Sequence, residues 1–242
     1  MKFTYQSYRE LLTLLKENGY AFTNYHQYKE KPRCVILRHD IDQSLSASES
    51  LAEIEAENGV ASTYFVLLRS DFYNPASKAS MTALRHIQSL GHEIGLHFDE
   101  VSYGKELTAD EIKQAVTKEC ELLSALLETP VSTVSMHRPS KNTLEANLEI
   151  PGIVNSYGKT FFHDFKYLSD SRRNWREPVL DIIRSGEYDR LHILTHAFWY
   201  HEENRDIAAS IADFVRIAPH ERYLGMRDNI RDLETVLREE EI

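Results

Sequence analysis

Apolar positions along the chain follow two periods, one typical of helices and one typical of strands. Tyr8, Leu11, Leu12 and Leu15 recur at helical spacing and Gly19 follows them, which predicts an amphipathic helix over the flank or floor of a domain. Seven further segments alternate between strand-like and helical patterns: Cys34–Leu37, Ser46–Asn58, Thr63–Leu68, Ser77–Leu90, Glu93–His97, Thr108–Leu127 and Val131–Met136. Such a β-α-β-α-β-α-β series predicts a parallel sheet.

The pattern is clear at the start of the last helix in this series and becomes less regular after it. The helix from residue 108 begins with Thr-Ala-Asp-Glu, a capping box in which hydroxyl and carboxylate satisfy each other's backbone donors. Residues 141–175 form a long polar and aromatic stretch, and such stretches are often functional. Leu191–Thr195 then predicts one more strand, and Ile207–Val215 and Ile230–Leu237 predict two helices.

Composition limits the class of protein. At 242 residues with 42% hydrophobic side chains, the chain can form one domain of barrel size, and we expect a single domain over residues 1–242. The net charge of −10 and the absence of a basic stripe argue against nucleic-acid binding and favour a small molecule or saccharide. Cys34 and Cys120 lie in no C-x-x-C spacing, so we expect packed thiols.

We find no candidate membrane segment. No run of about 18 apolar residues occurs, and residues 1–20 lack a basic region followed by an apolar one. We therefore expect a cytoplasmic protein.

Titratable side chains crowd the end of the first central strand, which continues into Arg38-His39-Asp40-Ile41-Asp42. Asp40 and Asp42 share a face in extended backbone, so one can hold a cation while the other accepts a proton. The alternative is that Asp42 or Ser44 caps the following helix.

Three other strands also end in candidate ligands or acids. His97 and Asp99 share a face of one strand, His137 and Arg138 end another, and His196 follows the late strand. Each histidine taken singly could be a packed core residue, and Arg138 could simply neutralise an aspartate. The carboxyl ends of parallel strands meet on one rim, however, which is where such folds build their chemistry. Neither a G-x-G-x-x-G turn, a P-loop nor a G-x-S-x-G elbow is present, which leaves metal-assisted hydrolysis.

The order of these motifs resembles that of the polysaccharide deacetylases, the NodB-like domains of carbohydrate esterase family 4. The resemblance covers roughly residues 33 to 200 and is carried by four motifs: Arg38–Asp42, Gly91–His97, His137–Pro139 and Leu194–His196. Ser62–Val66 is similar to the second strand of that family. The HDxD form of the first motif, with Tyr167–Ser171 followed by Trp175, is most similar to a divergent branch associated with surface-polysaccharide and lipopolysaccharide biosynthesis.

The resemblance implies an α/β fold, a distorted (β/α) barrel of the NodB type, holding one divalent metal that is usually zinc. Asp40 would match the catalytic base, Asp42 the metal-binding aspartate and His97 the first metal histidine. Because Ile41 separates aspartates that are adjacent in typical members, the roles of Asp40 and Asp42 could be exchanged.

The remaining catalytic roles come from later motifs. Arg138 would match the arginine that orients the base, and Asp170 the acidic residue that supports this arginine. His196 would match the general acid that protonates the leaving nitrogen.

The chain departs from the family pattern at one ligand. A second metal histidine usually follows the first by four residues, and that position is Val101. His137 is our first candidate for the replacement, with Asp99, His39 and His163 as alternatives.

The expected function is removal of an N-acyl, acetyl-type group from a sugar or sugar-containing precursor in surface-polysaccharide metabolism. An amidase acting on another N-acyl or N-formyl small molecule is one alternative. A degenerate barrel that binds a saccharide without turnover, suggested by Val101, is another. Trp175, Trp199, Tyr157 and Phe161 could stack on a sugar or simply pack beneath a loop.

Overall fold

The computed structural model describes all 242 residues, which divide into two compact units, Met1–Glu202 and Glu203–Ile242. Every candidate site residue lies in the first unit. The expectation of a single domain over the whole chain stays a prediction.

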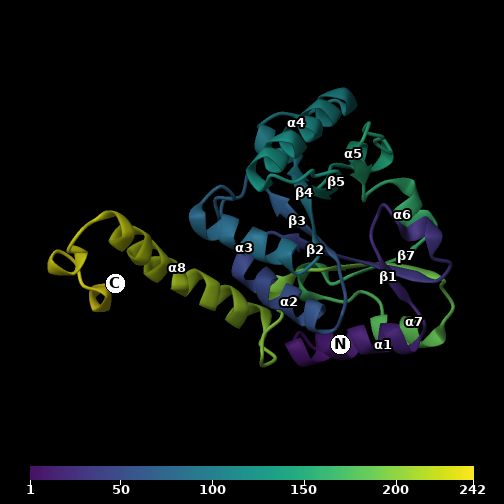
Figure 1. Ribbon diagram of the computed structural model, residues 1–242, viewed down its shortest axis with the longest axis horizontal. Coiled ribbons are helices and arrows are strands. Elements are labelled where there is room, and N and C mark those ends of the chain that lie inside the picture. Colours follow the sequence, from purple (N-terminus) through teal and green to yellow (C-terminus); the bar gives the residue numbers. More distant parts are fainter. The chain divides into compact units, whose positions relative to one another are not determined.

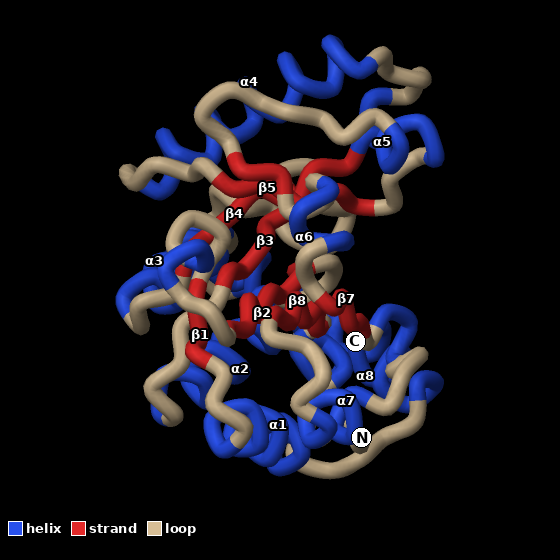
Figure 2. The backbone as a smooth tube through the Cα atoms, turned by 90° about the vertical axis from the view of Figure 1, so that its right-hand side faces the viewer, coloured by secondary structure: helices blue, strands red, loops and turns tan.

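The first unit is built on a sheet of eight strands that all pair in parallel. The strands are β1 Ala21–Thr23, β2 Cys34–Ile41, β3 Thr63–Leu67, β4 Glu93–Asp99, β5 Thr133–His137, β6 Val154–Asn155, β7 Lys166–Ser169 and β8 Arg190–Thr195. Their order is β6-β5-β4-β3-β2-β8-β7, with β1 added to β2. Figure 2 shows this sheet curving from β5 to β7. The predicted α/β fold is confirmed as a barrel that stays open, since β6 and β7 do not pair.

Helices cover the strands (Figure 1). They are α1 Tyr5–Glu17, α2 Leu45–Glu57, α3 Lys78–Ser89, α4 Ala109–Leu127, α5 Lys141–Glu145, α6 Lys159–His163 and α7 Val179–Ser185. The predicted capping box at Thr108 and Glu111 is present. Ser44 caps α2 by accepting a hydrogen bond from the backbone N–H of Ala47 at 3.2 Å, so Asp42 is not needed as the cap.

Side-chain alternation along β2 separates two environments. All eight residues of the strand are buried. Cys34 and Ile36 belong to a cluster with Phe65 and other aromatic side chains, and Arg38 and Asp40 continue the same face towards the carboxyl end. The sheet therefore carries a charged pair on top of an apolar layer. Both thiols are free and buried, as expected.

The stretch from residue 141 to 175 is more ordered than predicted. It contains α5, β6, α6 and β7. None of these elements exceeds five residues, which is too short for a hydrophobic period to show.

The second unit consists of one long helix and two short turns. α8 spans Ile207–Asn229 without a break at Pro219 and is capped by Asp206, whose carboxylate accepts from the N–H of Ala209 at 2.7 Å. The predicted helix over Ile230–Leu237 is wrong. Ile230 is extended and Asp232 adopts a left-handed φ of 59°, which stops a helix, and only 3₁₀ turns follow.

No helix in either unit combines the length and the apolar character that crossing a lipid bilayer requires.

Candidate metal and active site

Three predicted ligands converge at the carboxyl edge of the sheet. Asp42 Oδ1 lies 3.2 Å from His97 Nε2 and 3.2 Å from His137 Nδ1, and the two imidazole nitrogens lie 3.1 Å apart. Ligand atoms held at about 2.0–2.1 Å by a tetrahedral ion are separated by roughly 3.3 Å. The three atoms therefore have the spacing of three corners of a tetrahedral metal site.

The hydrogen bonding of Asp42 supports the same interpretation. Its Oδ1 is buried and has no hydrogen-bond partner, although two imidazole nitrogens lie 3.2 Å away. Burial raises the pKa of Asp42, but the neighbouring His137 and His97 outweigh it and hold the pKa well below its usual value. A buried, ionised oxygen without a well-directed donor fits a metal ligand.

Strand order explains how His137 reaches this position. β4 and β5 are neighbours in register, with Asp99 opposite His137, so His97 and His137 end on the same rim. Val101 lies in the turn after β4 and is 59% exposed. The third member of the convergent group therefore comes from the next strand instead of the position four residues after His97.

The other candidates for the third ligand lie elsewhere. Asp99 accepts from Arg138 at 2.6 Å, and His163 is an exposed residue of α6. His39 points to the opposite face of β2, where Nε2 donates to Glu55 Oε1 at 2.9 Å and Nδ1 lies 2.6 Å from Thr195 Oγ1. None of the three belongs to the convergent group.

Asp40 lies directly beside this triangle and is held by a buried arginine. Its Oδ2 is 2.7 Å from Arg38 Nη2 and 3.7 Å from His97 Nε2. Arg38 is fully buried and also donates to Ser135 at 2.7 Å and to Ser156 at 3.0 Å. Burial raises the pKa of Asp40, but Arg38, followed by the nearby histidines, lowers it below the usual value.

This contact differs from the one that the resemblance implies for Arg138. The arginine beside Asp40 is Arg38, two residues earlier on the same strand face, whereas Arg138 pairs with Asp99 and has a side chain 61% exposed. Arg138 adopts a positive φ of 48°, so the chain turns away from the strand direction at that residue. Sequence spacing could have indicated Arg38, because residues two apart on a strand share a face.

His196 completes the site from β8. Its Nδ1 lies 2.6 Å from Asp170 Oδ1, and its Nε2 lies 3.8 Å from Asp42 Oδ2. Burial lowers the pKa of His196, but Asp170, followed by Asp42 and Asp40, outweighs burial and raises the pKa to about 9. Asp170 thus supports His196 and not Arg138 as predicted, because β7 pairs with β8 and places residue 170 beside the end of that strand.

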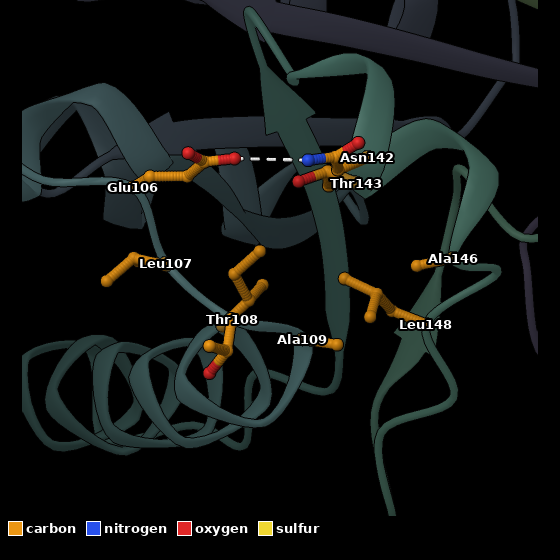
Figure 3. Close-up of a pocket in the computed structure, with 9 residues that line it drawn as sticks. Glu106, Leu107, Thr108, Ala109, Asn142, Thr143, Ala146 and Leu148 are labelled. Carbon is orange, nitrogen blue, oxygen red and sulfur yellow. Dashed lines mark hydrogen bonds between the residues drawn. The ribbon is translucent and has the colours of Figure 1, made fainter.

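A pocket of about 640 Å³ includes none of the site residues, but one of its lining residues, Tyr157, has its ring 5.0 Å from the guanidinium carbon of Arg38. Tyr157 and Trp175 line it, as a sugar-stacking role would require. Phe161 and Trp199 are only 5% and 8% exposed, so for these two the packing alternative holds. A separate pocket of about 470 Å³ between α4 and α5, where Asn142 donates to Glu106 at 3.0 Å, contains none of the site residues (Figure 3).

Sequence reasoning missed a buried polar centre behind the site. Glu55 is fully buried on α2 and accepts hydrogen bonds from Tyr8, His39, Ser62 and Tyr64. A glutamate within a helix is usually exposed. Its position four residues after the buried Leu51 was the available signal, because that spacing puts it on the inner face.

Comparison with known proteins finds similarity only among solved structures. No protein-family model matches the chain, and no curated protein matches it. A family 4 carbohydrate esterase from Streptomyces lividans in complex with acetate is 15% identical over 77% of this chain and 86% of its own, with a TM-score of 0.48. The deacetylase PplD of Streptococcus pyogenes in complex with acetate is 13% identical over 58% of this chain, with a TM-score of 0.46. BA3943, a CE4 family pseudoenzyme from Bacillus anthracis, is 16% identical over 80% of this chain, with a TM-score of 0.45.

The chain spans 66% of the length of PplD and 62% of that of BA3943. With all three TM-scores below 0.5, these similarities do not extend to activity or substrate.

Proposed function

We propose that the protein is a metal-dependent hydrolase that removes an N-acyl, acetyl-type group from a sugar or sugar-containing precursor. The observation that carries the proposal is the triangle of Asp42, His97 and His137 with Asp40 and His196 beside it. Asp40 Oδ2 and His196 Nε2 each lie within 4 Å of a ligand side chain, at 3.7 Å from His97 and 3.8 Å from Asp42.

The donor set suits a catalytic zinc ion. Two imidazoles and one carboxylate are typical of catalytic zinc sites, in which three protein ligands leave a position for water or substrate. When bound, such an ion polarises the acyl carbonyl and lowers the pKa of water from its bulk value towards about 7.

Asp40 is suited to act as the general base. In hydrolysis a water oxygen bonds to the acyl carbon, and Asp40 takes the proton that this water loses. Arg38 keeps the carboxylate oriented through the 2.7 Å contact, and the hydroxyls of Ser135 and Ser156 hold Arg38 in turn.

His196 is suited to act as the general acid. A proton on Nδ1 is held by Asp170, so Nε2 is the nitrogen directed towards the site. As the carbon–nitrogen bond breaks, His196 gives its Nε2 proton to the departing nitrogen. The products are a free amine and a small carboxylic acid.

The proposed substrate and setting rest on the motif resemblance and on the pocket. The HDxD motif supports a sugar precursor in surface-polysaccharide metabolism, and the pocket beside the site offers aromatic side chains for it. The binding-only alternative rests on Val101, whereas the convergence of His137 with Asp42 and His97 supports the hydrolase. An amidase acting on an N-formyl or other N-acyl small molecule remains the second candidate.

Elemental analysis of protein purified without chelator tests the metal. We expect about one zinc-type ion per chain in the wild type and loss of the ion in Asp42→Ala, His97→Ala and His137→Ala, since a catalytic site has three protein ligands. His163→Ala is the matched control, because it removes an exposed histidine outside the triangle.

Amine release from N-acetylated and N-formylated sugars tests the reaction. Asp40→Asn should keep the metal and lose amine release, which separates the base from the ligands. If the wild-type chain takes up no zinc when the metal is added, the proposed hydrolase is refuted, and the alternative of a barrel that binds a saccharide without turnover is favoured. Retention of metal in His137→Ala would refute the ligand set.

A further inference from the structure

The pocket beside the site has an unusual combination of aromatic and cationic side chains. Among its lining residues are Tyr157, Tyr167 and Trp175, together with Arg172 and Arg176. We call these five residues the aromatic–arginine pocket. Its volume of about 640 Å³ is in the range of small-molecule sites.

Its position ties it to the candidate catalytic residues. The Tyr157 ring lies 5.0 Å from the guanidinium carbon of Arg38, the partner of Asp40. Ser169 and Ser171, which flank Asp170, also line the pocket. The pocket therefore lies beside Arg38 and Asp170, the residues that hold Asp40 and His196, so a substrate that extends from the pocket to the site would span both.

The charge of the pocket is opposite to that of the chain. The chain carries a net charge of −10, with 38 acidic and 28 basic residues. Arg172 and Arg176 are nevertheless exposed and form no ion pair. Glu177 is the only carboxylate among the lining residues, and it is paired with Lys166 at 2.6 Å. Two guanidinium groups thus face this pocket without a compensating acid.

The backbone holds one of these arginines in a strained conformation. Arg172 has φ 58° and ψ 33°, and Arg173 has φ 56°. Left-handed conformations are uncommon outside glycine and cost free energy that the surrounding structure must supply. The guanidinium of Arg173 lies 4.7 Å from the Phe3 ring. This contact anchors Arg173 and so holds the preceding residue, Arg172, at the pocket.

We infer that the aromatic–arginine pocket binds the anionic group of the substrate, which is then an N-acyl sugar carrying a phosphate or a carboxylate. The inference rests on the proposed function of the neighbouring site. Arg172 and Arg176 pair with the anion, because guanidinium groups bind phosphate and carboxylate through two parallel hydrogen bonds. Trp175 and Tyr157 provide flat surfaces for the sugar.

Calorimetric titration with defined probes tests this inference. The probes are N-acetylglucosamine, its 1-phosphate, N-acetylmuramic acid and inorganic phosphate. We expect an anionic sugar to bind the wild type at least tenfold more tightly than the neutral sugar, with the difference shrinking at high salt. The double variant Arg172→Gln/Arg176→Gln should lose this preference, and both side chains are exposed, so the core is not disturbed.

Arg85→Gln is the matched control, because Arg85 is an exposed α3 residue outside the pocket and forms no ion pair. It should bind as the wild type does. The same titrations on chelator-treated protein exclude direct binding of phosphate to a metal ion. Preference for the 1-phosphate identifies a phosphorylated sugar, and preference for N-acetylmuramic acid identifies a sugar acid.

Equal affinity for neutral and anionic sugars, or an anion preference that survives in the double variant, would overturn the inference. If the wild type shows no arginine-dependent preference for anionic sugars but still releases amine from neutral sugars, the proposed hydrolysis stands and only the anion-binding inference fails. If anionic sugars bind through the arginines but none of the probes releases amine, the proposed hydrolysis fails and the pocket assignment stands.

Discussion

Replacing Glu55 with glutamine should strongly destabilise the first unit. The carboxylate is fully buried and accepts four hydrogen bonds, from Tyr8 at 2.6 Å, His39 at 2.9 Å, Ser62 at 2.6 Å and Tyr64 at 2.8 Å. These donors come from α1, β2, β3 and the turn before β3, so one side chain joins four parts of the unit.

The geometry sets the expected magnitude. A carboxylate can accept all four hydrogen bonds, but an amide has one oxygen, so two donors would face an NH₂ group. Each buried donor left without a partner costs about 1–3 kcal/mol, giving roughly 2–6 kcal/mol in the free energy of unfolding at neutral pH.

The pKa of Glu55 gives a second measure. Burial raises it, but His39, followed by His92 and Ser62, outweighs burial and lowers the pKa from 4.5 to about 2. Such a shift corresponds to about 3 kcal/mol. Because the folded pKa lies below the unfolded value, this stabilisation is complete above about pH 5 and is lost as the pH falls from there to 2.

Urea unfolding at several pH values measures both effects. The control is Glu57→Gln, which removes an exposed carboxylate of the same helix whose contact with Arg9 is 3.8 Å long, and it should cost less than about 1 kcal/mol. The free-energy difference between wild type and Glu55→Gln should shrink as the pH falls from about 5 to 3. A loss below about 1 kcal/mol at pH 7, or a difference independent of pH, would refute the reasoning.

Four further outcomes are expected. Gly95→Ala should cost about 1–3 kcal/mol in urea unfolding, because a Cβ there would lie 2.5 Å from Phe65 in a filled core, and an unchanged midpoint would contradict this packing. Arg38→Gln should cost about 3–5 kcal/mol by leaving Asp40 buried without its partner, and should abolish amine release. Arg138→Gln should cost less than about 1 kcal/mol, and equal effects of the two arginine variants would contradict the corrected pairing. Removing the metal with a chelator should lower the thermal midpoint, and zinc at roughly a thousand times its dissociation constant should restore about 4 kcal/mol, whereas a midpoint insensitive to metal would count against the site.

Five of the eight strands, the longer helices and the convergence of the candidate ligands were accessible from the sequence, whereas β1, β6 and β7 were not predicted. Hydrophobic period and capping are local properties, so α2, α3 and α4 begin and end within about two residues of their predicted bounds. The convergence of Asp42, His97 and His137 followed from a topological rule, because parallel strands end on one rim. The prediction of a helix over Ile230–Leu237 was wrong because the apolar spacing there fits short turns as well as a helix.

The pairing of charged groups was decided by the tertiary structure. Arg38 and not Arg138 serves Asp40 because the backbone dihedral at residue 138 turns that side chain towards Asp99. Asp170 meets His196 because β7, which is only four residues long, pairs with β8. Sequence determines which side chains stand at the strand ends, whereas their partners depend on strand neighbours and backbone angles that form only when distant segments pack together.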